Sequence, residues 1–300
     1  MKGEIVMKEI ENWLNTVRSK GTKKTYKKNA EEFMEYKEIK KFEDFKKLDA
    51  DDYYSWIDYL INKKGNTENT AKSKISALSS FYAYLLANPK YGVLTNPIIN
   101  ARIHNTVKAT TNPERTTWLT KEEMNSFMSQ CRNTREKAIC GIFLNTGLRV
   151  SEVIGLELEN YKHFINENNE NCSNILAKRK GGKLQIIEFN PYVTKLIDNY
   201  LKIRKKTDCP NLFVSNAGNP MSVQSIDRTI HKLAKRAGIN KNVSAHSLRR
   251  SAATAMYGAG FDIKEIQSVL GHSSSGTTDI YLKGLENRAN HVFQNFVIKG

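Results

Sequence analysis

The chain has 300 residues, a formal net charge of +16 at pH 7 and 39% hydrophobic residues, which is enough apolar material for two ordinary domains. So large a basic excess favours a polyanionic partner, most simply nucleic acid, although solubility or a lysine-biased genome would leave the same composition. No apolar run reaches about 18 residues, so no transmembrane helix is predicted. Charges also interrupt the N-terminal stretch where a signal peptide needs its apolar core. We therefore expect a cytoplasmic protein without a membrane partner.

The sequence contains no recognisable motif for a metal or cofactor site. The four cysteines, at positions 131, 140, 172 and 209, form no C-x-x-C pair and no disulfide framework, which favours free thiols in a reducing compartment. The sequence contains no carboxylate cluster and no phosphate-binding loop of the G-x-x-x-x-G-K-[ST] type. We therefore expect no metal, no nucleotide and no other cofactor.

Residues 1–102 have the periodicity of helices and no strand signal. The pattern predicts a helix near residues 23–36, a second that begins after the N-cap candidate Asp49, and a third near residues 70–86. The polar face of the third helix carries Lys72 and Lys74. These helices would form a small all-α domain that packs through its apolar stripes.

A polar stretch without periodicity, residues 103–117, is interpreted as a linker. The capping-box pattern from Thr120 to Glu123 then starts a helix in the second domain, residues 118–300. Buried helices are expected at residues 138–145, ending at Gly147, and at residues 150–156. Strand-like runs at 173–177 and 184–189 flank a Gly-Gly pair and indicate a β-hairpin. The remainder after Asn190-Pro191 is expected to be helical.

Two patterns early in the second domain carry residues suited to phosphate chemistry. The run Thr146-Gly-Leu-Arg149 places an arginine at the start of a helix, with Glu152 one turn later. The hairpin contains Lys180. Each pattern alone is more often structural, a helix junction with a surface arginine or a solvated lysine.

Two further patterns follow towards the C-terminus. His246-Ser-Leu-Arg249 places an imidazole and a guanidinium one helical turn apart, so both belong to one face. The run Leu270-Gly-His272 is followed by Tyr281 nine residues after the histidine. Their order and spacing, together with the two earlier patterns, favour one shared site.

These patterns resemble the tyrosine recombinases, also called the phage integrase family. Residues 146–156 (TGLRVSEVIGL) are similar to the family's first box, residues 246–282 to its second box, and residues 177–189 (AKRKGGKLQIIEF) to its β-hairpin. Residues 67–86 (TENTAKSKISALSSFYAYLL) are similar to its helical core-binding domain. The resemblance implies a mainly α protein of the compact Xer-like branch. By this resemblance, the chain would have an all-α SAM-like core-binding domain (1–102) and an α+β catalytic domain (118–300) with a small antiparallel sheet.

The resemblance also assigns chemical roles. Tyr281 would attack a DNA phosphate, forming a 3′-phosphotyrosyl bond and a free 5′ hydroxyl without metal or ATP. Arginine forks suit the charge that grows on the nonbridging oxygens. A phenol with a pKa of about 10 needs help to lose its proton, and Lys180 would protonate the leaving oxygen. Glu152 would orient the site without touching the phosphate. The implied catalytic set is Arg149, Lys180, His246, Arg249, His272 and Tyr281.

By the same resemblance, the partner is double-stranded DNA that carries a specific recombination site. Four protomers would exchange strands through a Holliday junction, as a homotetramer or together with a related recombinase. An amphipathic segment at residues 285–297 would either cap its own domain or, as the family favours, bind the neighbouring protomer. Candidate DNA contacts, each of which could instead belong to a solvated helix face, are Lys23, Lys24, Lys27, Lys72 and Lys74.

Several points stay open at the level of the sequence. Arg250 follows the second-box arginine, where family members often have histidine, and Lys178 is the fallback for Lys180, beside Lys183. The role is either integration and excision of a mobile element or resolution of DNA dimers. The alternatives are a catalytically weak DNA-binding regulator, which would not need the full catalytic set, and a type IB topoisomerase-like relaxing activity, against which the Xer-like domain pair argues.

Overall fold

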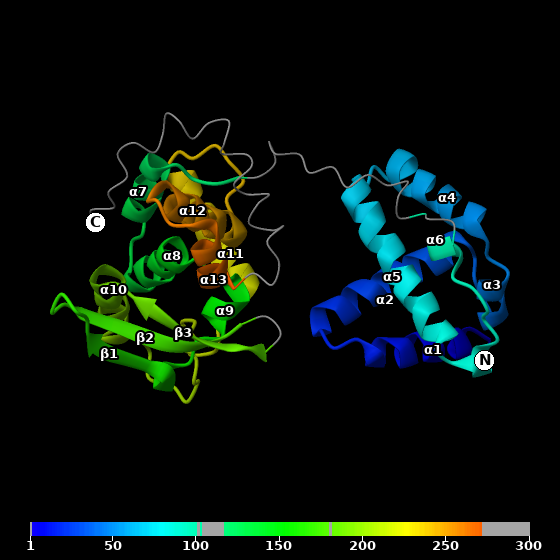
Figure 1. The fold of residues 1–300 in the computed structure, drawn as a ribbon, viewed down its shortest axis with the longest axis horizontal. Helices are drawn as coiled ribbons and strands as arrows, with labels where there is room; N and C mark the ends of the chain where they lie inside the picture. Colours follow the sequence, from blue (N-terminus) through cyan, green and yellow to red (C-terminus); the bar gives the residue numbers. More distant parts are fainter. Residues whose placement is uncertain (1, 101–102, 104–116, 180–181, 272–300) are drawn as a thin grey trace. The chain divides into compact units, whose positions relative to one another are not determined.

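In the part of the chain that the structure describes, two large hydrophobic cores lie one in each half of the sequence, and a small third cluster contains Ala253, Ile266 and Leu270. The structure, a computed structural model, describes residues 2–100, 103, 117–179 and 182–271. Contacts between Cα atoms divide the chain into two compact units, residues 1–111 and 112–300 (Figure 1). Ile103 is buried in the first core, but most of the predicted linker lies outside the described residues, so the predicted domain boundaries stay a prediction.

All the regular secondary structure in the described residues of the first unit is helical, as the sequence predicts. The helix after Asp49 is confirmed, because the Asp49 carboxylate accepts hydrogen bonds from the amides of Asp51 and Asp52. The helices are α1 (Lys2–Thr16), α2 (Lys20–Tyr36), α3 (Phe42–Lys46), α4 (Ala50–Asp58) with a π-helical turn (Tyr59–Lys63), α5 (Glu68–Leu86), a 3-10 turn (Pro89–Tyr91) and α6 (Pro97–Asn100).

Aromatic side chains fill the core of this unit. The Phe33 ring from α2 packs on Tyr53 and Trp56 of α4, with ring centroids 5.1 and 4.7 Å apart. The Tyr53 hydroxyl donates to Tyr82 Oη of α5 over 2.8 Å, and Tyr82 in turn donates to the Phe45 carbonyl. Because these hydroxyls are satisfied inside the core, α2, α4 and α5 are held in a fixed arrangement.

The second unit combines helices with one small sheet. In its described residues no helix is both long and apolar enough to cross a membrane, and the same holds for the first unit. The elements are α7 (Lys121–Ser129), α8 (Thr134–Thr146), α9 (Val150–Ile154), a 3-10 turn (Leu158–Asn160), β1 (Tyr161–Ile165), β2 (Asn171–Lys178), β3 (Leu184–Phe189), α10 (Pro191–Leu201), α11 (Val223–Arg236), α12 (Ala245–Gly258) and α13 (Ile263–Leu270).

Helix α8 forms the centre of this unit. Its residues 138–144 are all buried, because α10 and α12 pack against it from different directions. The predicted capping box at Thr120 and Glu123 starts α7. The predicted stop at Gly147 is also confirmed, since Gly147 caps α8 with a left-handed φ of 61°.

The sheet has the strand order β1-β2-β3 and is antiparallel throughout. The predicted hairpin is confirmed as β2 and β3, in the register that pairs Ile175 with Ile187. Helix α10 covers the inner face, where the Ser173 and Thr194 hydroxyls lie 2.9 Å apart. Strand β1 is an addition that the sequence did not reveal, because an edge strand with mostly exposed residues shows no clear alternation.

The expectation that everything after α10 is helical is wrong for residues 204–222. This segment is a loop with isolated β-bridges, Glu157 with Asn211 and Val214 with Pro220. In this loop the backbone carbonyls of Cys209, Asn211 and Leu212 accept hydrogen bonds from the guanidinium of Arg204, in place of the backbone amides that they would bind in a helix.

Candidate active site

The first predicted arginine stands at the junction of α8 and α9. The left-handed Gly147 turns the chain, and Arg149 then occupies the N-cap position of α9. The Arg149 amide donates to Glu152 Oε2 over 2.8 Å, and Arg149 Nη1 donates to Glu152 Oε1 over 2.9 Å. The carboxylate therefore binds both the backbone amide and the guanidinium of Arg149, and the predicted role of Glu152 in the reaction stays a prediction.

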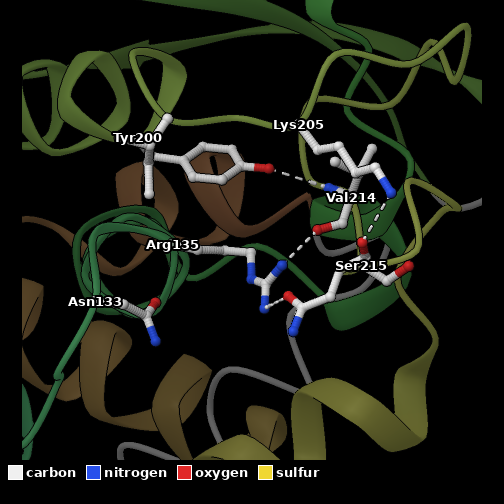
Figure 2. Close-up of a pocket in the computed structure, with 8 residues that line it drawn as sticks. Asn133, Arg135, Tyr200, Lys205, Val214 and Ser215 are labelled. Atoms are coloured by element: carbon white, nitrogen blue, oxygen red, sulfur yellow. Dashed lines mark hydrogen bonds between the residues drawn. The ribbon is translucent and has the colours of Figure 1, made fainter.

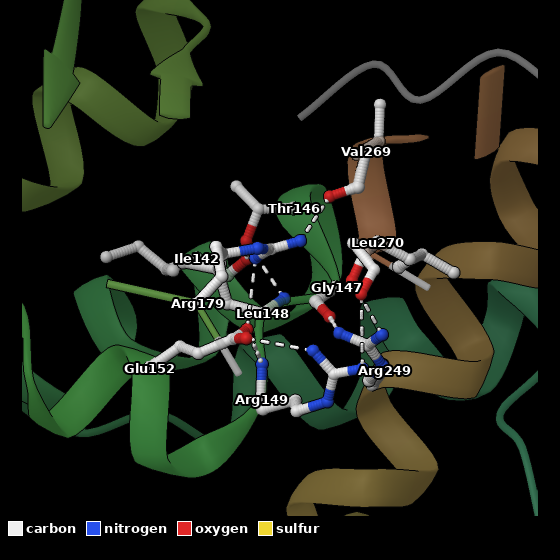
Figure 3. A network of polar contacts seen from close by, with 11 residues as sticks. Ile142, Thr146, Gly147, Leu148, Arg149, Glu152, Arg179, Arg249, Val269 and Leu270 are labelled. Atoms are coloured by element: carbon white, nitrogen blue, oxygen red, sulfur yellow. Dashed lines mark hydrogen bonds and ion pairs between the residues drawn. The ribbon is translucent and has the colours of Figure 1, made fainter. Parts of the chain in front are cut away.

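The second predicted arginine is held from two sides. Arg249 on α12 is only 2% exposed. Its Nη1 donates to the Gly147 carbonyl over 2.6 Å, and its Nη2 donates to the Leu270 carbonyl over 2.8 Å. Figure 3 shows that the α8–α9 junction, α12 and the end of α13 converge on this guanidinium. The two sequence boxes, which are far apart along the chain, thus meet at one place.

A third arginine, Arg179, belongs to the same cluster, although the sequence patterns did not single it out. Its side chain is 4% exposed, and its Nη1 donates to Glu152 Oε2 over 3.0 Å. Burial lowers the pKa of Arg179 and the charge of Arg149 lowers it further, whereas Glu152 raises it; an arginine nevertheless stays protonated. The strand alternation, with Ile175 and Ala177 buried, was the signal that residue 179 faces inward.

His246 lies in the first turn of α12, in an exposed position. Partial burial of the ring, together with the charges of Arg250, Arg249 and Arg149, lowers the pKa of His246 to about 4. Solvent screens part of this repulsion because the residue is exposed. The imidazole is therefore neutral at pH 7, the form in which a histidine can act as a proton acceptor.

The cluster has an excess of positive charge. Arg149 and Arg179 share one carboxylate, Glu152. These three residues line a hollow of about 650 Å³, to which Lys178 and a second carboxylate, Glu157, also contribute. Arg249 adds a third guanidinium at the adjoining α8–α9 junction. Among the described residues, no group of His, Cys, Asp and Glu side chains has the arrangement of a metal site. The hollow suits an anionic group such as a phosphate diester.

A second hollow, of about 400 Å³, lies near the start of α8 and has a different character (Figure 2). Its cations already serve the neighbouring loop: Arg135 donates to the Val214 carbonyl and to Asn216 Oδ1 over 2.8 and 2.9 Å. Lys205 Nζ donates to the Asn216 carbonyl over 3.1 Å. These contacts hold the loop 204–222, and none of them involves a residue of the predicted catalytic set.

Of the lysines predicted to contact DNA, two form ion pairs with glutamates, and the other three are exposed or partly exposed. Lys74 is buried and its Nζ lies 2.8 Å from Glu32, so this lysine does not lie on a solvated helix face. Lys27 forms an ion pair with Glu11. Lys24 is exposed on α2 and lines a groove of about 870 Å³ to which Lys74 also contributes. Lys23 and Lys72 are partly exposed. Contact of these lysines with DNA stays a prediction.

The other predicted site residues lie outside the part of the chain that the structure describes. They are Lys180, His272 and Tyr281, together with the amphipathic segment 285–297. Their roles stay predictions. Lys178, the fallback for Lys180, is exposed at the end of β2, and Lys183 is exposed just before β3.

Comparison with known proteins identifies relatives over most of the chain. Tyrosine recombinase XerC of Caldanaerobacter subterraneus is 33% identical over 78% of this chain, and the aligned region spans 64% of that relative. Tyrosine recombinase XerC of Thermodesulfovibrio yellowstonii is 30% identical over 91% of this chain and 90% of its own length. A lambda integrase tetramer bound to a Holliday junction has the same fold, with a TM-score of 0.71 at 15% identity over 98% of this chain and 80% of that one.

Both halves of the chain also match known domain families. Residues 11–88 match the N-terminal SAM-like domain of phage integrases, in agreement with the all-α first unit. Residues 117–288 match the phage integrase family, and this region contains the arginine cluster. The chain therefore belongs to the phage integrase family of tyrosine recombinases.

Proposed function

We propose that this protein is a site-specific DNA recombinase that cuts and rejoins DNA strands through a 3′-phosphotyrosyl intermediate on Tyr281. The observation that supports it most is the convergence of Arg149 and Arg249, one from each sequence box, beside one hollow with an excess of positive charge. In a tyrosine recombinase, this arrangement is suited to the scissile phosphate.

The geometry supports a division of chemical work. Two guanidinium groups would bind the nonbridging oxygens and stabilise the charge that they gain in the transition state. Neutral His246, with a pKa lowered to about 4, would accept or share the proton that the tyrosine hydroxyl loses. Lys180 would protonate the departing 5′ oxygen, and His272 would add a donor. Because the phosphotyrosine conserves the bond energy, rejoining requires no ATP.

The proposed partner is double-stranded DNA with a specific recombination site. The related lambda integrase is described as a tetramer on a Holliday junction, and we propose that four protomers of this chain, alone or with a related recombinase, assemble in the same way. The reaction would serve either integration and excision of a mobile element or resolution of DNA dimers.

Trapping the covalent intermediate tests this function. DNA selected from a random pool by the protein itself provides the site, which is then built into a nicked suicide duplex from which the cleaved end diffuses away. The wild-type protein should give a slowly migrating protein–DNA adduct on a denaturing gel, and Tyr281→Phe should give none. An adduct that survives Tyr281→Phe would exclude this nucleophile. Binding without any adduct would favour the DNA-binding regulator, and relaxation of a supercoiled plasmid that lacks the site would favour the topoisomerase-like activity.

A further inference from the structure

The C-terminal end of α13 binds three arginines through three successive carbonyls. Val269 O accepts from Arg179 Nη2 over 2.7 Å, Leu270 O accepts from Arg249 Nη2 over 2.8 Å, and Gly271 O accepts from Arg149 Nη2 over 3.4 Å. The last carbonyls of a helix have no partner within the helix and carry its negative dipole end. Guanidinium groups therefore stabilise this end, and Figure 3 shows the Arg179 and Arg249 contacts side by side.

Arg179 also shares the carboxylate that orients Arg149. Glu152 Oε1 accepts from Arg149 Nη1, whereas Oε2 accepts from both Arg179 Nη1 and the Arg149 amide. Glu152 is 4% exposed, so water does not replace a missing donor easily. Without Arg179, the carboxylate would lose one of the donors that fix its rotamer, and the guanidinium of Arg149 would lose its fixed support.

The backbone of Arg179 connects these contacts to the hairpin. Its amide donates to the Lys183 carbonyl over 2.7 Å, and its carbonyl accepts from the Gly182 amide over 3.0 Å. The guanidinium also packs directly on Gly271, where a Cβ would lie 2.6 Å from Nη2 and 2.7 Å from Nε. The side chain thus fills the space between the hairpin and the end of α13, and only a glycine leaves room for it.

We propose that Arg179 is a positioning residue of the recombination reaction, which ties the β2–β3 hairpin, Glu152 and the end of α13 together and so presents Arg149 to the phosphate in a fixed orientation. This inference rests on the proposed function. Arg179 is not itself catalytic, because it is buried and both of its Nη atoms donate to protein acceptors. It was absent from the catalytic set implied by family resemblance.

Substitution of Arg179 in the full chain tests this role. Arg179→Met should slow single-turnover cleavage of the suicide duplex by about 100-fold, the loss expected when a transition-state contact is misplaced by about 1 Å, while the Kd for DNA changes less than about twofold. Arg179→Lys keeps the charge but not the planar fork. Its cleavage rate should therefore lie between that of the wild-type protein and that of Arg179→Met. Arg135→Met is the matched control, because Arg135 also donates to a backbone carbonyl but holds the loop near Val214, and it should cleave at the wild-type rate.

A modified phosphate separates positioning from a general folding defect. In a methylphosphonate duplex, a methyl group replaces one nonbridging oxygen at the scissile position, so less charge needs stabilising. If Arg179 acts through Arg149, Arg179→Met should lose much more rate on the phosphate than on the methylphosphonate, and Arg149→Met should show the same pattern. A folding defect would lower both rates by one factor, and that result would overturn the inference. If Arg179→Met does not fold, the same comparison with Arg179→Lys decides.

The outcomes also separate this inference from the proposed function. Wild-type protein that forms no adduct on its selected site would overturn the proposed function and the inference with it. A wild-type adduct together with full activity of Arg179→Met on the phosphate duplex would overturn the inference alone.

Discussion

At the scale of single residues, the site contains more cationic than anionic side chains among the residues that the structure describes. Glu152 accepts from Arg149 and Arg179, whereas Arg249 is held by the backbone carbonyls of Gly147 and Leu270. Backbone carbonyls orient a guanidinium but leave its full charge in place. The cluster therefore keeps an excess of positive charge, which favours a bound phosphate and disfavours a proton on the nearby His246.

Partial burial of the ring, followed by the charges of the neighbouring arginines, determines the pKa of His246. Its folded pKa of about 4 lies below the ordinary value of 6.5, so the unfolded chain binds the proton more readily between these two values. The neutral form thus contributes stability above pH 6.5 that is lost as the pH falls towards 4. An NMR titration of the histidine ring protons, assigned with His246→Gln, should give a midpoint near 4, and Arg250→Gln should raise it. A midpoint at or above the ordinary value would contradict the proposed role of the arginines.

At the scale of elements, the sequence was most informative where local chemistry decides the structure. The Asp49 and Thr120 caps, the stop at Gly147 and the β2–β3 hairpin depend on side chains within a few residues, and all of them were predictable. Strand β1 and the loop 204–222 were not, because an exposed edge strand has no apolar alternation and the loop depends on Arg204 binding carbonyls of residues 209–212.

The site was predictable only in part, for the same reason. The boxes around Arg149 and Arg249 identify a family, so their meeting could be expected from resemblance. Arg179 sits in a run of basic residues that suggests a solvated hairpin tip. The alternation of β2, if continued, turns residue 179 inward, but its partners Glu152 and Val269 become visible only in the tertiary structure. Lys74 likewise follows a polar pattern, yet its partly buried partner Glu32 comes from another helix. Long-range pairing of charges is not visible in local periodicity.

The junction between α8 and α9 depends on glycine for two separate reasons. Gly147 has a φ of +61°, and a Cβ there would lie 2.4 Å from Leu270 Cδ2. Gly147→Ala should lower the free energy of unfolding by about 2–4 kcal/mol, which combines left-handed strain with a core clash. It should also slow cleavage, because the Gly147 carbonyl holds Arg249. Urea unfolding and the suicide duplex measure the two effects.

Gly238 provides the matched control for this substitution. It has a similar φ of +67°, but a Cβ there would meet nothing within 4 Å. Gly238→Ala should therefore cost only the left-handed strain, about 1–2 kcal/mol, and leave cleavage unchanged. If the two variants lose equal stability, the Leu270 side chain must move away from the new methyl group at little cost. The contact with Leu270 would then not be a reason why the α8–α9 junction requires glycine.

At the scale of the whole molecule, the net charge of +16 favours binding of phosphate groups. Not every lysine side chain is available for such a contact. Lys74 shares Glu32 with Lys64, with both Nζ–O distances at 2.8 Å. Burial opposes ionisation of Glu32, but the hydrogen bonds and charges of Lys64 and Lys74 outweigh it and lower its pKa. Glu32 thus compensates one of these two positive charges inside the first unit, whereas Lys24 is exposed.

The salt dependence of DNA binding should therefore distinguish lysines that look alike in the sequence. When the logarithm of the association constant for DNA is plotted against the logarithm of the salt concentration, the slope is negative. Its magnitude falls by about 0.9 for each phosphate that the protein no longer neutralises. Lys24→Gln should reduce the slope by about that amount without changing stability. Lys74→Gln should leave the slope unchanged and instead lower the free energy of unfolding, because Glu32 is deprived of a buried partner.

Fluorescence anisotropy across a salt series and urea unfolding of both variants provide the comparison. Lys24 and Lys74 line the same groove, so the pair differs mainly in whether the ammonium group is already neutralised by Glu32. If Lys74→Gln reduces the slope as much as Lys24→Gln does, the ion pair with Glu32 opens on DNA, and the first unit rearranges its charges when it binds.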